Sequence, residues 1–319
     1  MSGGGSTGTV RVATRASLLA RTQSSLVADQ LRAILGTRVE LVEVRTTGDS
    51  DQRTPLASFG GVGVFVTAVR EAVLRGEADL AVHSLKDLPT AEAPGLTLAA
   101  VPPREDPRDV LVARDGGTVA TLRPGATVGT GSPRRAAQLL ALRPDLDVVA
   151  VRGNVDTRLR MVSEGSLDAV VLAHAGLARL DRLDAVTEVL EPDQMLPAPG
   201  QGALAVECRD IDVDGALLDA LRALDDDATR VAVTAERALL AALEAGCSAP
   251  VGAHATVSRF GGEVLVHLTG LVVSLDGRTQ VRKSVTGSAG DAVAVGRDLA
   301  HDLLAAGAPG LHPVRGSAS

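Results

Sequence analysis

Short apolar runs alternate with helical patterns through the first two-thirds of this chain. The runs are rich in Val, Leu and Ala, and they are TVRVAT, VELVEV, DLAVHS, TLAAV, DVVAV, DAVVLA and ALAVE. Between the second and third runs, residues 64–73 place apolar side chains at helical spacing, and Gly76 follows where a helix would end. This alternation predicts βαβ units around largely parallel sheets.

Two segments rich in Pro or charge divide this pattern. They are VPPREDPRD (101–109) and LPAPGQG (196–202), and we interpret them as the two strands of one hinge. From Asp225 a long helical pattern is followed by two strand-like runs joined by a Leu-Asp-Gly turn, which predicts a hairpin. The sequence therefore predicts an α/β domain 1 at 9–102 and 203–222, an α/β domain 2 at 107–198, and a small α+β domain 3 at 226–312.

Composition excludes several classes of partner. The 319 residues exceed what one hydrophobic core usually organises. Aromatic residues make up 1% of the chain, with no Trp or Tyr, and the net charge is −7, which argues against stacking on single-stranded nucleic acid and against general binding to phosphate backbones. MSGGGSTG has no apolar signal segment, and no stretch is long enough to span a membrane. We therefore expect a cytoplasmic protein with neither a nucleic acid nor a membrane as partner.

The two cysteines need separate interpretations. Cys208 and Cys247 lie far apart without CxxC or Cys/His spacing, so we predict neither a disulfide framework nor a metal site. Cys208 follows an apolar strand and is predicted to be buried. Cys247 lies on a loop after a helix, with Gly246 just past the helix end. A lone loop thiol is more often passive, and no His lies near it in the sequence to indicate a protease-like pair, which stays open as an alternative.

Charged residues follow the run DLAVHS. Ser84, Lys86 and Asp87 emerge at the end of a predicted strand, where open parallel sheets usually bind ligands. Lys86 can hold an anion, and Asp87 can act as an acid, a base or a stabiliser of a cation. A solvated Lys-Asp loop is the alternative.

Arginines occur at several strand-to-helix junctions. In GTGSPRR, Ser132 suits a helix N-cap, and two arginines fall in the first turn. Cations there oppose the helix dipole, so an anion bound at the helix end would explain them, with a solvated basic turn as the alternative. Because arginine binds carboxylates bidentately, repeated arginines suit a ligand with many carboxylates. The junction residues are Arg15, Ser17, Ser132, Arg134, Arg135, Arg152, Gly153, Arg158 and Arg179.

Taken in order, these segments resemble the hydroxymethylbilane synthase (porphobilinogen deaminase) family. The resemblance covers nearly the whole chain and runs through RVATRAS, TTGD, HSLKD, REDPRD, GTGSPRR, RGNVDTRL, AGLARL, LPAPGQGA, TAERALL and EAGCSAPVG. It implies two doubly wound domains like those of periplasmic binding proteins, joined by a hinge, with the site in the cleft between them. The small α+β third domain would carry the cofactor cysteine.

The resemblance also implies a reaction. A dipyrromethane cofactor would be attached to Cys247 through a thioether, and four porphobilinogen molecules would be deaminated and added to it head to tail. The enzyme, a transferase of tetrapyrrole biosynthesis, would then release hydroxymethylbilane and ammonia. Asp87 matches the family's catalytic aspartate.

The resemblance implies substrate- or cofactor-binding roles as well. Ser58 and Val62 stand where some members carry lysines, so we expect arginines elsewhere, rather than this loop, to hold the polypyrrole. Thr47 also replaces a residue that is often basic in the family. We expect a monomer, and hand-over of product to the next pathway enzyme stays open.

The alternative functions are a non-catalytic periplasmic-type binding protein, which would need an export signal, and a phosphoanion-binding transferase, which would not need Cys247. The predicted binding residues are Arg15, Ser17, Gln23, Phe65, Ser84, Lys86, Thr130, Ser132, Arg134, Arg135, Arg152, Gly153, Arg158 and Arg179.

Overall fold

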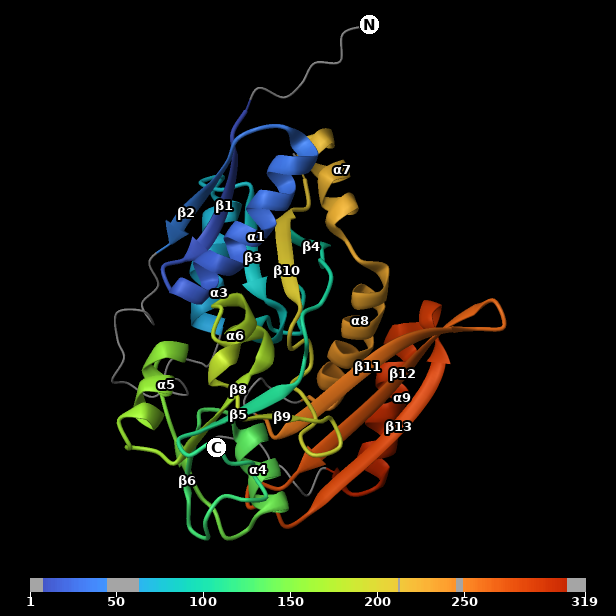
Figure 1. Cartoon of the computed structure of the whole chain (residues 1–319). Coiled ribbons are helices and arrows are strands. Elements are labelled where there is room, and N and C mark those ends of the chain that lie inside the picture. The colour runs from blue at the N-terminus through green and yellow to red at the C-terminus, as the bar shows by residue number, and fades with distance from the viewer. Residues whose placement is uncertain (1–7, 45–62, 212, 245–248, 309–319) are drawn as a thin grey trace, which may run out of the picture. The chain divides into compact units, whose positions relative to one another are not determined.

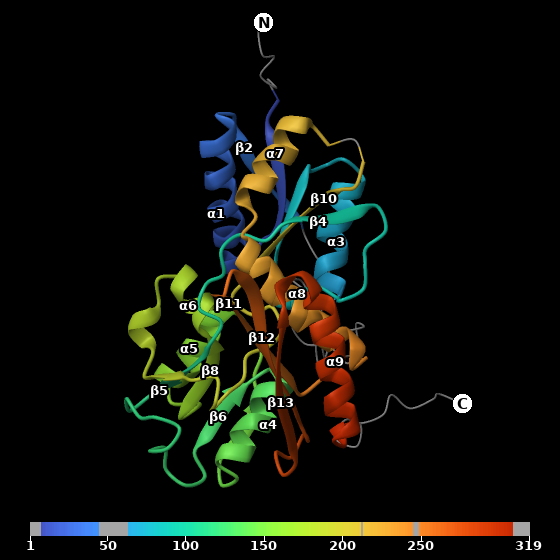
Figure 2. The same ribbon diagram turned by 90° about the vertical axis from the view of Figure 1, so that its right-hand side faces the viewer.

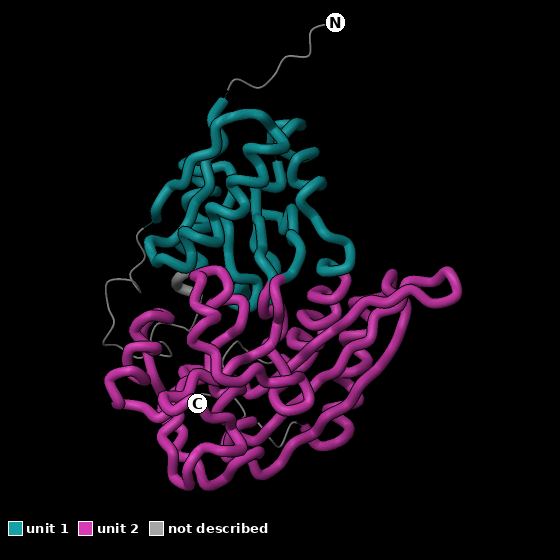
Figure 3. The backbone as a smooth tube through the Cα atoms, in the orientation of Figure 1, with its two compact units in different colours: residues 1–104, 203–230 teal, residues 105–202, 231–319 magenta. Residues whose placement is uncertain are grey.

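The computed structural model describes residues 8–44, 63–211, 213–244 and 249–308 (Figure 1). The chain divides into two compact units (Figure 3). Unit 1 comprises residues 1–104 and 203–230, and unit 2 comprises residues 105–202 and 231–319. The chain therefore leaves unit 1 near residue 104 and returns to it near residue 203, close to the two segments predicted as a hinge.

Unit 1 is built on a five-stranded sheet with the order β2-β1-β3-β10-β4. β1 pairs in parallel with β2 and β3, whereas β10 runs antiparallel to β3 and β4. The strands are β1 (Val10–Arg15), β2 (Val39–Val44), β3 (Leu80–Ser84), β4 (Leu96–Ala100) and β10 (Leu204–Arg209).

Helices cover both faces of this sheet. Buried side chains of α1 (Leu18–Leu35) and α7 (Gly215–Leu224) share one core with the strands, and α3 (Gly63–Leu74) packs into a second core. Helix α1 starts at the predicted N-cap Ser17, whose side chain accepts a hydrogen bond from the Ala20 amide. It ends at Gly36, which has a left-handed backbone.

Unit 2 contains a second five-stranded sheet, with the order β7-β6-β8-β5-β9. Its three parallel strands are β6, β7 and β8, and β5 pairs antiparallel with β8 and β9. Helix α4 packs into one core, and α5 and α6 pack into the other. The elements are β5 (Asp109–Ala113), β6 (Thr127–Thr130), β7 (Asp147–Ala150), β8 (Ala169–Ala173), β9 (Glu188–Leu190), α4 (Pro133–Leu142), α5 (Val155–Ser163) and α6 (His174–Arg179).

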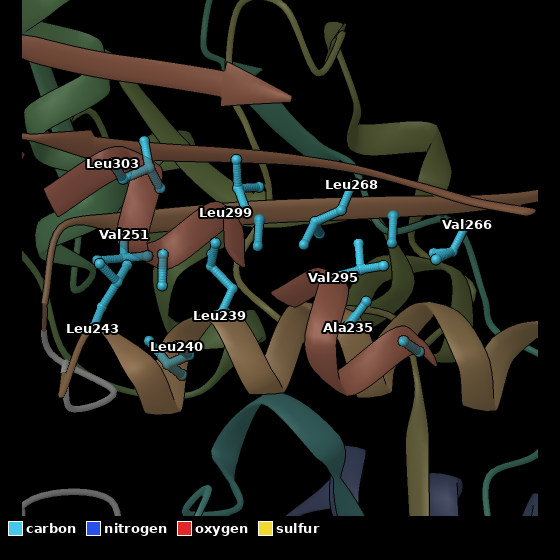
Figure 4. Packing of buried hydrophobic residues seen from close by; sticks show 14 of the residues in the cluster. Ala235, Leu239, Leu240, Leu243, Val251, Val266, Leu268, Val295, Leu299 and Leu303 are labelled. Atoms are coloured by element: carbon cyan, nitrogen blue, oxygen red, sulfur yellow. The ribbon is translucent and has the colours of Figure 1, made fainter. Parts of the chain in front are cut away.

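The C-terminal part of unit 2 is an antiparallel sheet of β11 (Val251–Phe260), β12 (Glu263–Val273) and β13 (Gln280–Ser288). Helix α9 (Ala292–Ala305) lies along this sheet (Figure 2). Its buried side chains meet those of the sheet and of α8 (Asp227–Ala242) in one core (Figure 4). Leu239 of α8, Leu268 of β12 and Leu299 of α9 are almost fully buried there.

The predicted fold class is confirmed: two α/β sheets covered by helices on both faces, and an α+β part at the C-terminus. Every predicted apolar run forms a strand, and the predicted hairpin is β12–β13. The sequence interpretation did not identify β5, β9 and β11 as strands or α7 and α9 as helices. The limits of three separate domains stay a prediction, because residues 231–319 form one unit with residues 105–202. None of the described helices combines the length and apolar character needed to cross a membrane.

Candidate functional site

Predicted site residues of unit 1 lie at one edge of its sheet. Arg15 ends β1 and Ser84 ends β3. Because these strands are parallel neighbours, their carboxyl ends lie at the same edge. Ser17, which caps α1, follows Arg15 by two residues.

Gln23 and Ser84 pair with each other at this edge. Gln23, buried on α1, donates from Nε2 to Ser84 Oγ at 2.9 Å, and Ser84 Oγ donates to Gln23 Oε1 at 3.1 Å. A hydroxyl can donate and accept in this way. The pair ties α1 to the end of β3.

Asp87 lies on a short turn directly after β3. Residues Leu85–Asp87 form a single 3₁₀ turn, η2, in which Leu85 is fully buried. The Leu85 amide donates to the Ala203 carbonyl at 3.0 Å, and the Leu88 amide donates to the Leu85 carbonyl at 3.1 Å. Lys86 and Asp87 are half-buried. The Asp87 carboxylate has no hydrogen-bond or ion-pair partner among the described residues, so a firmly held turn presents a carboxylate that can act on a ligand.

In unit 2 the predicted turn after β6 has the local structure of an anion site. Thr130 is buried, and its Oγ1 accepts from the Ser132 amide at 3.2 Å. Ser132 caps α4 as predicted by accepting from the Arg135 amide at 3.4 Å, and Pro133 begins the helix. Pro133 has no N–H and the Arg135 amide is taken by Ser132, so this turn offers a bound anion the Arg134 amide and the positive end of the helix dipole.

Arg158 lies against this turn. A Cβ atom placed on Gly131 would lie 3.5 Å from Arg158 Nη2. Arg158 Nε donates to the Gly153 carbonyl at 3.0 Å, whereas its two Nη atoms have no partner among the described residues. Burial lowers the pKa of Arg158, and the positive charge of Arg135 lowers it further. A desolvated guanidinium beside a helix N-terminus is a strong candidate for binding a carboxylate.

Arg134 and Arg135 do not present themselves to a ligand in this way. Both are buried, and both pair with Asp109, which is itself completely buried. Arg134 Nη2 lies 2.7 Å from Asp109 Oδ2, and Arg135 Nε donates to Asp109 Oδ1 at 2.9 Å. Gln201 Nε2 donates to the same Oδ1 at 2.8 Å. The hypothesis that an anionic ligand explains both arginines overlooked this carboxylate.

The charges of this cluster shift each other's pKa values. Burial alone would raise the pKa of Asp109, but the charges of Arg134 and Arg135 outweigh it, so the pKa lies below its ordinary value. Burial lowers the pKa of Arg134. Arg134 Nη1 also donates to the Leu196 carbonyl at 2.6 Å, so the cluster joins β5, α4 and the 196–202 segment.

Arg179 of α6 and Glu236 of α8 also form hydrogen bonds to the 196–202 segment. Arg179 Nη2 donates to the Gly202 carbonyl at 2.6 Å, and burial lowers its pKa while the charge of Glu105 opposes that shift. Glu236 of α8 is fully buried and accepts from the Gly200 amide at 2.6 Å and the Ala255 amide at 2.8 Å.

Arg152 is exposed after β7, and Gly153 makes the predicted turn with a φ of +99°.

Several predicted positions lie outside the described residues. These are Cys247, Ser58, Val62, Thr47 and the side chain of Phe65.

The structure in turn reveals residues that the sequence interpretation missed. Asp109 opens the apolar strand DVLVA, and Glu207 interrupts the apolar strand LAVECR. A carboxylate inside an apolar run signals a buried charge partner, and that signal was available in the sequence.

Comparison with known proteins gives consistent matches. Residues 10–216 match the family model described as "Porphobilinogen deaminase, dipyromethane cofactor binding domain", and residues 230–305 match "Porphobilinogen deaminase, C-terminal domain". The porphobilinogen deaminase of Thermobifida fusca is 56% identical over 310 residues, covering 95% of each chain. That of Mycobacterium tuberculosis is 57% identical over 304 residues, covering 94% of this chain and 97% of the relative.

Solved structures show a more distant likeness. The VFT2 domain of Bordetella pertussis BvgS is 20% identical, with a TM-score of 0.41, and the match covers 69% of this chain and 90% of that one.

Proposed function

This chain belongs to the porphobilinogen deaminase family, because the family model of the dipyrromethane cofactor-binding domain matches residues 10–216. From that premise we propose how the residues of this chain carry out the reaction. The enzyme is a hydroxymethylbilane synthase, a transferase of tetrapyrrole biosynthesis. It deaminates four porphobilinogen molecules and joins them head to tail on the dipyrromethane, releasing one ammonia for each. Water then cleaves the bond between the tetrapyrrole and the dipyrromethane, which releases hydroxymethylbilane. Family membership favours this function over a non-catalytic binding protein or a phosphoanion transferase.

Cys247 is the proposed attachment point of the dipyrromethane. Its place in EAGCSAPVG, between α8 and β11, supports this assignment. The other cysteine, Cys208, is completely buried in β10, and burial raises the pKa of its thiol. Because the thiolate is the reactive form, a buried thiol with a raised pKa is a poor attachment point.

The observation that carries the proposal is the environment of Arg158. Each pyrrole ring of substrate and cofactor carries an acetate and a propionate, so the growing chain is strongly anionic. The Arg158 Nη groups and the positive N-terminal end of α4 can bind such a carboxylate, assisted by the hydroxyls of Thr130 and Ser132. When bound, the dipyrromethane supplies the pyrrole carbon that takes up the first substrate unit.

The remaining predicted basic residues receive distinct roles. Arg15, Lys86, Arg152 and Arg179 are proposed to neutralise further carboxylates. Arg134 and Arg135 are proposed to support the site from the interior, because both side chains are buried and both pair with Asp109, whose single negative charge offsets one of their two positive charges. The cleft between the first two domains, the monomeric state and the cytoplasmic location stay predictions.

Asp87 is the proposed catalytic residue. Its carboxylate assists proton transfer as ammonia leaves porphobilinogen, and it stabilises the azafulvene cation that forms. It also accepts hydrogen bonds from pyrrole N–H groups. Its position on the turn held by Leu85 supports this role, because a fixed carboxylate loses little freedom when it meets the developing charge.

Intact mass spectrometry combined with turnover measurements tests these assignments. The purified enzyme should carry an adduct equal to two substrate-derived pyrrole units, and Cys247→Ser should abolish it. Asp87→Asn should fold but lose turnover, whereas the control Asp29→Asn, on an exposed part of α1, should keep it. Active enzyme with an unmodified mass would exclude Cys247 as the anchor. Normal turnover by Asp87→Asn would remove Asp87 from its role.

A further inference from the structure

A buried ion pair ties α3 to β10 in unit 1. Arg70 of α3 donates from Nε to Glu207 Oε2 at 2.8 Å and from Nη2 to Oε1 at 2.7 Å. The side chains are 15% and 6% exposed, respectively. Such a bidentate pair fixes orientation as well as distance, because the planar guanidinium meets both carboxylate oxygens at once.

His83 faces the same carboxylate. In the antiparallel pairing of β10 with β3, Glu207 stands opposite Ala81, so Glu207 and His83 are diagonal neighbours on one face of the sheet. His83 is buried, and its Nε2 lies 3.4 Å from Glu207 Oε2 without the alignment of a hydrogen bond. The carboxylate therefore lies between a guanidinium and an imidazole.

The end of β3 is held from both faces. Successive strand residues point to opposite sides, so His83 faces Glu207 and Arg70, and Ser84 faces Gln23 on α1. The turn bearing Asp87 begins at the next residue, Leu85. Any shift in the end of β3 is thus passed directly to that turn.

Stability alone does not account for this cluster. Buried charges are costly to desolvate, and apolar residues of similar volume often stabilise an interior equally well or better. Burial would raise the pKa of Glu207, but His83 and Arg70 lower it to about 2, so the carboxylate stays charged throughout the neutral range. A charged pair with a fixed bidentate geometry is therefore better suited to fixing the position of the end of β3 than to filling the interior.

We propose that Glu207 is a positioning residue for the reaction, which acts through Arg70 and His83 to set where the turn bearing Asp87 leaves β3. This inference rests on the proposed catalytic role of Asp87. Catalytic groups tolerate little displacement, since a misplacement of about 1 Å can cost on the order of a hundredfold in rate. The cluster would affect turnover without touching the substrate.

The central test removes both charges but keeps the volume. Arg70→Met combined with Glu207→Leu should fold, carry the two-pyrrole adduct, and show a kcat lower by roughly ten- to a hundredfold with KM little changed. The matched control, Arg75→Met with Glu77→Leu, removes an exposed Arg–Glu pair close to α3 and should leave kcat unchanged. A double variant with wild-type kcat would overturn the inference.

A second comparison separates positioning through His83 from a general effect of α3. His83→Gln should lower kcat by a similar factor, and adding it to the double variant should cause no further loss, because all three residues act through the same strand end. Fully additive losses would overturn the inference. If the double variant does not fold, Arg70→Lys retains the charge without the bidentate contact; reduced kcat in that variant supports positioning, and unchanged kcat contradicts it.

Asp87→Asn, measured in parallel, distinguishes failure of this inference from failure of the proposed function. If Asp87→Asn is inactive and the double variant is fully active, only the positioning role of Glu207 is excluded. If Asp87→Asn turns over normally, the proposed role of Asp87 is excluded, and with it the premise of the inference.

Discussion

Arg134 Nη2 lies 2.7 Å from Asp109 Oδ2 in the interior of unit 2, and neither side chain is more than 4% exposed. Arg135 shares the same carboxylate, with its Nη2 2.8 Å from Oδ1. The two arginines that follow the N-cap of α4 thus share a negative charge from β5, where Asp109 precedes Arg134 by 25 residues. Asp109 therefore holds together the start of α4 and the 196–202 segment.

Asp109→Asn should destabilise the protein strongly. It would leave two guanidinium groups in the interior without a carboxylate, and breaking one partner of a buried pair typically costs about 3–5 kcal/mol. Urea unfolding measures the difference. Asp156→Asn is the control, because the Arg182–Asp156 pair is about 40% exposed on both sides and should contribute less than about 1 kcal/mol. Equal effects of the two substitutions would contradict the importance of the buried cluster.

Arg158→Met should impair elongation much more than Arg160→Met. Both arginines lie on α5, but Arg158 is half-buried beside the Gly131 turn, whereas Arg160 is exposed. Loss of a charge-assisted carboxylate contact costs about 1.5–3 kcal/mol, which corresponds to roughly a ten- to hundredfold fall in kcat/KM. Steady-state kinetics with porphobilinogen compares the two variants. A comparable effect at Arg160 would place the carboxylate contact elsewhere.

Glu207 should make stability depend on acid pH. Its pKa falls from 4.5 to about 2 on folding, so its stabilising effect is complete above about pH 5 and is lost as the pH falls through this window. The difference in unfolding free energy between wild type and Glu207→Gln should therefore narrow by about 2 kcal/mol between about pH 6 and about pH 3. Glu71→Gln is the control, because it removes one partner of an exposed pair on α3 and should change the free energy of unfolding by less than about 1 kcal/mol at either pH.

Cys208 should resist alkylation in the folded protein. It is fully buried and burial raises the pKa of its thiol, so both access and thiolate formation are disfavoured. Treatment with iodoacetamide followed by peptide mass spectrometry should find Cys208 modified only when denaturant is present. Rapid modification under native conditions would show that β10 opens readily.

Gly202→Ala should destabilise the protein more than Gly36→Ala. Both glycines have positive φ angles, of +88° and +64°, and an alanine in this conformation costs about 1–2 kcal/mol. A Cβ atom on Gly202 would also lie 2.3 Å from the Glu105 carbonyl oxygen, whereas one on Gly36 would meet nothing within 4 Å. Thermal unfolding of the two variants should show the larger loss for Gly202→Ala, and an equal loss would indicate that the Glu105 segment can move aside.

Local sequence patterns predicted much of the site. Residue types alone predicted the helix caps at Ser17 and Ser132 and the turn at Gly153. Each cap accepts a hydrogen bond from a backbone amide three residues later, and the turn changes the chain direction at a single glycine. The ends of β1 and β3 were predictable as a shared edge because parallel strands place their carboxyl ends together. The Gln23–Ser84 pair joins residues 61 positions apart, and no local pattern specifies it.

The sequence by itself determined the family, the seven strands of the apolar runs, and the positions of Asp87 and Cys247 within their motifs, since the strands and motifs depend on residues close together in the chain. Only the tertiary structure decided which arginine side chains are buried against a carboxylate and which keep N–H groups for a ligand. Arg134, Arg135 and Arg158 all occupy basic strand-to-helix junctions in the sequence, yet folding brings Asp109 to the first two and leaves the Nη groups of Arg158 beside a helix N-terminus. The physical reason is that a counter-charge acts through distance in space, and in the folded chain that distance is set by how the strands assemble.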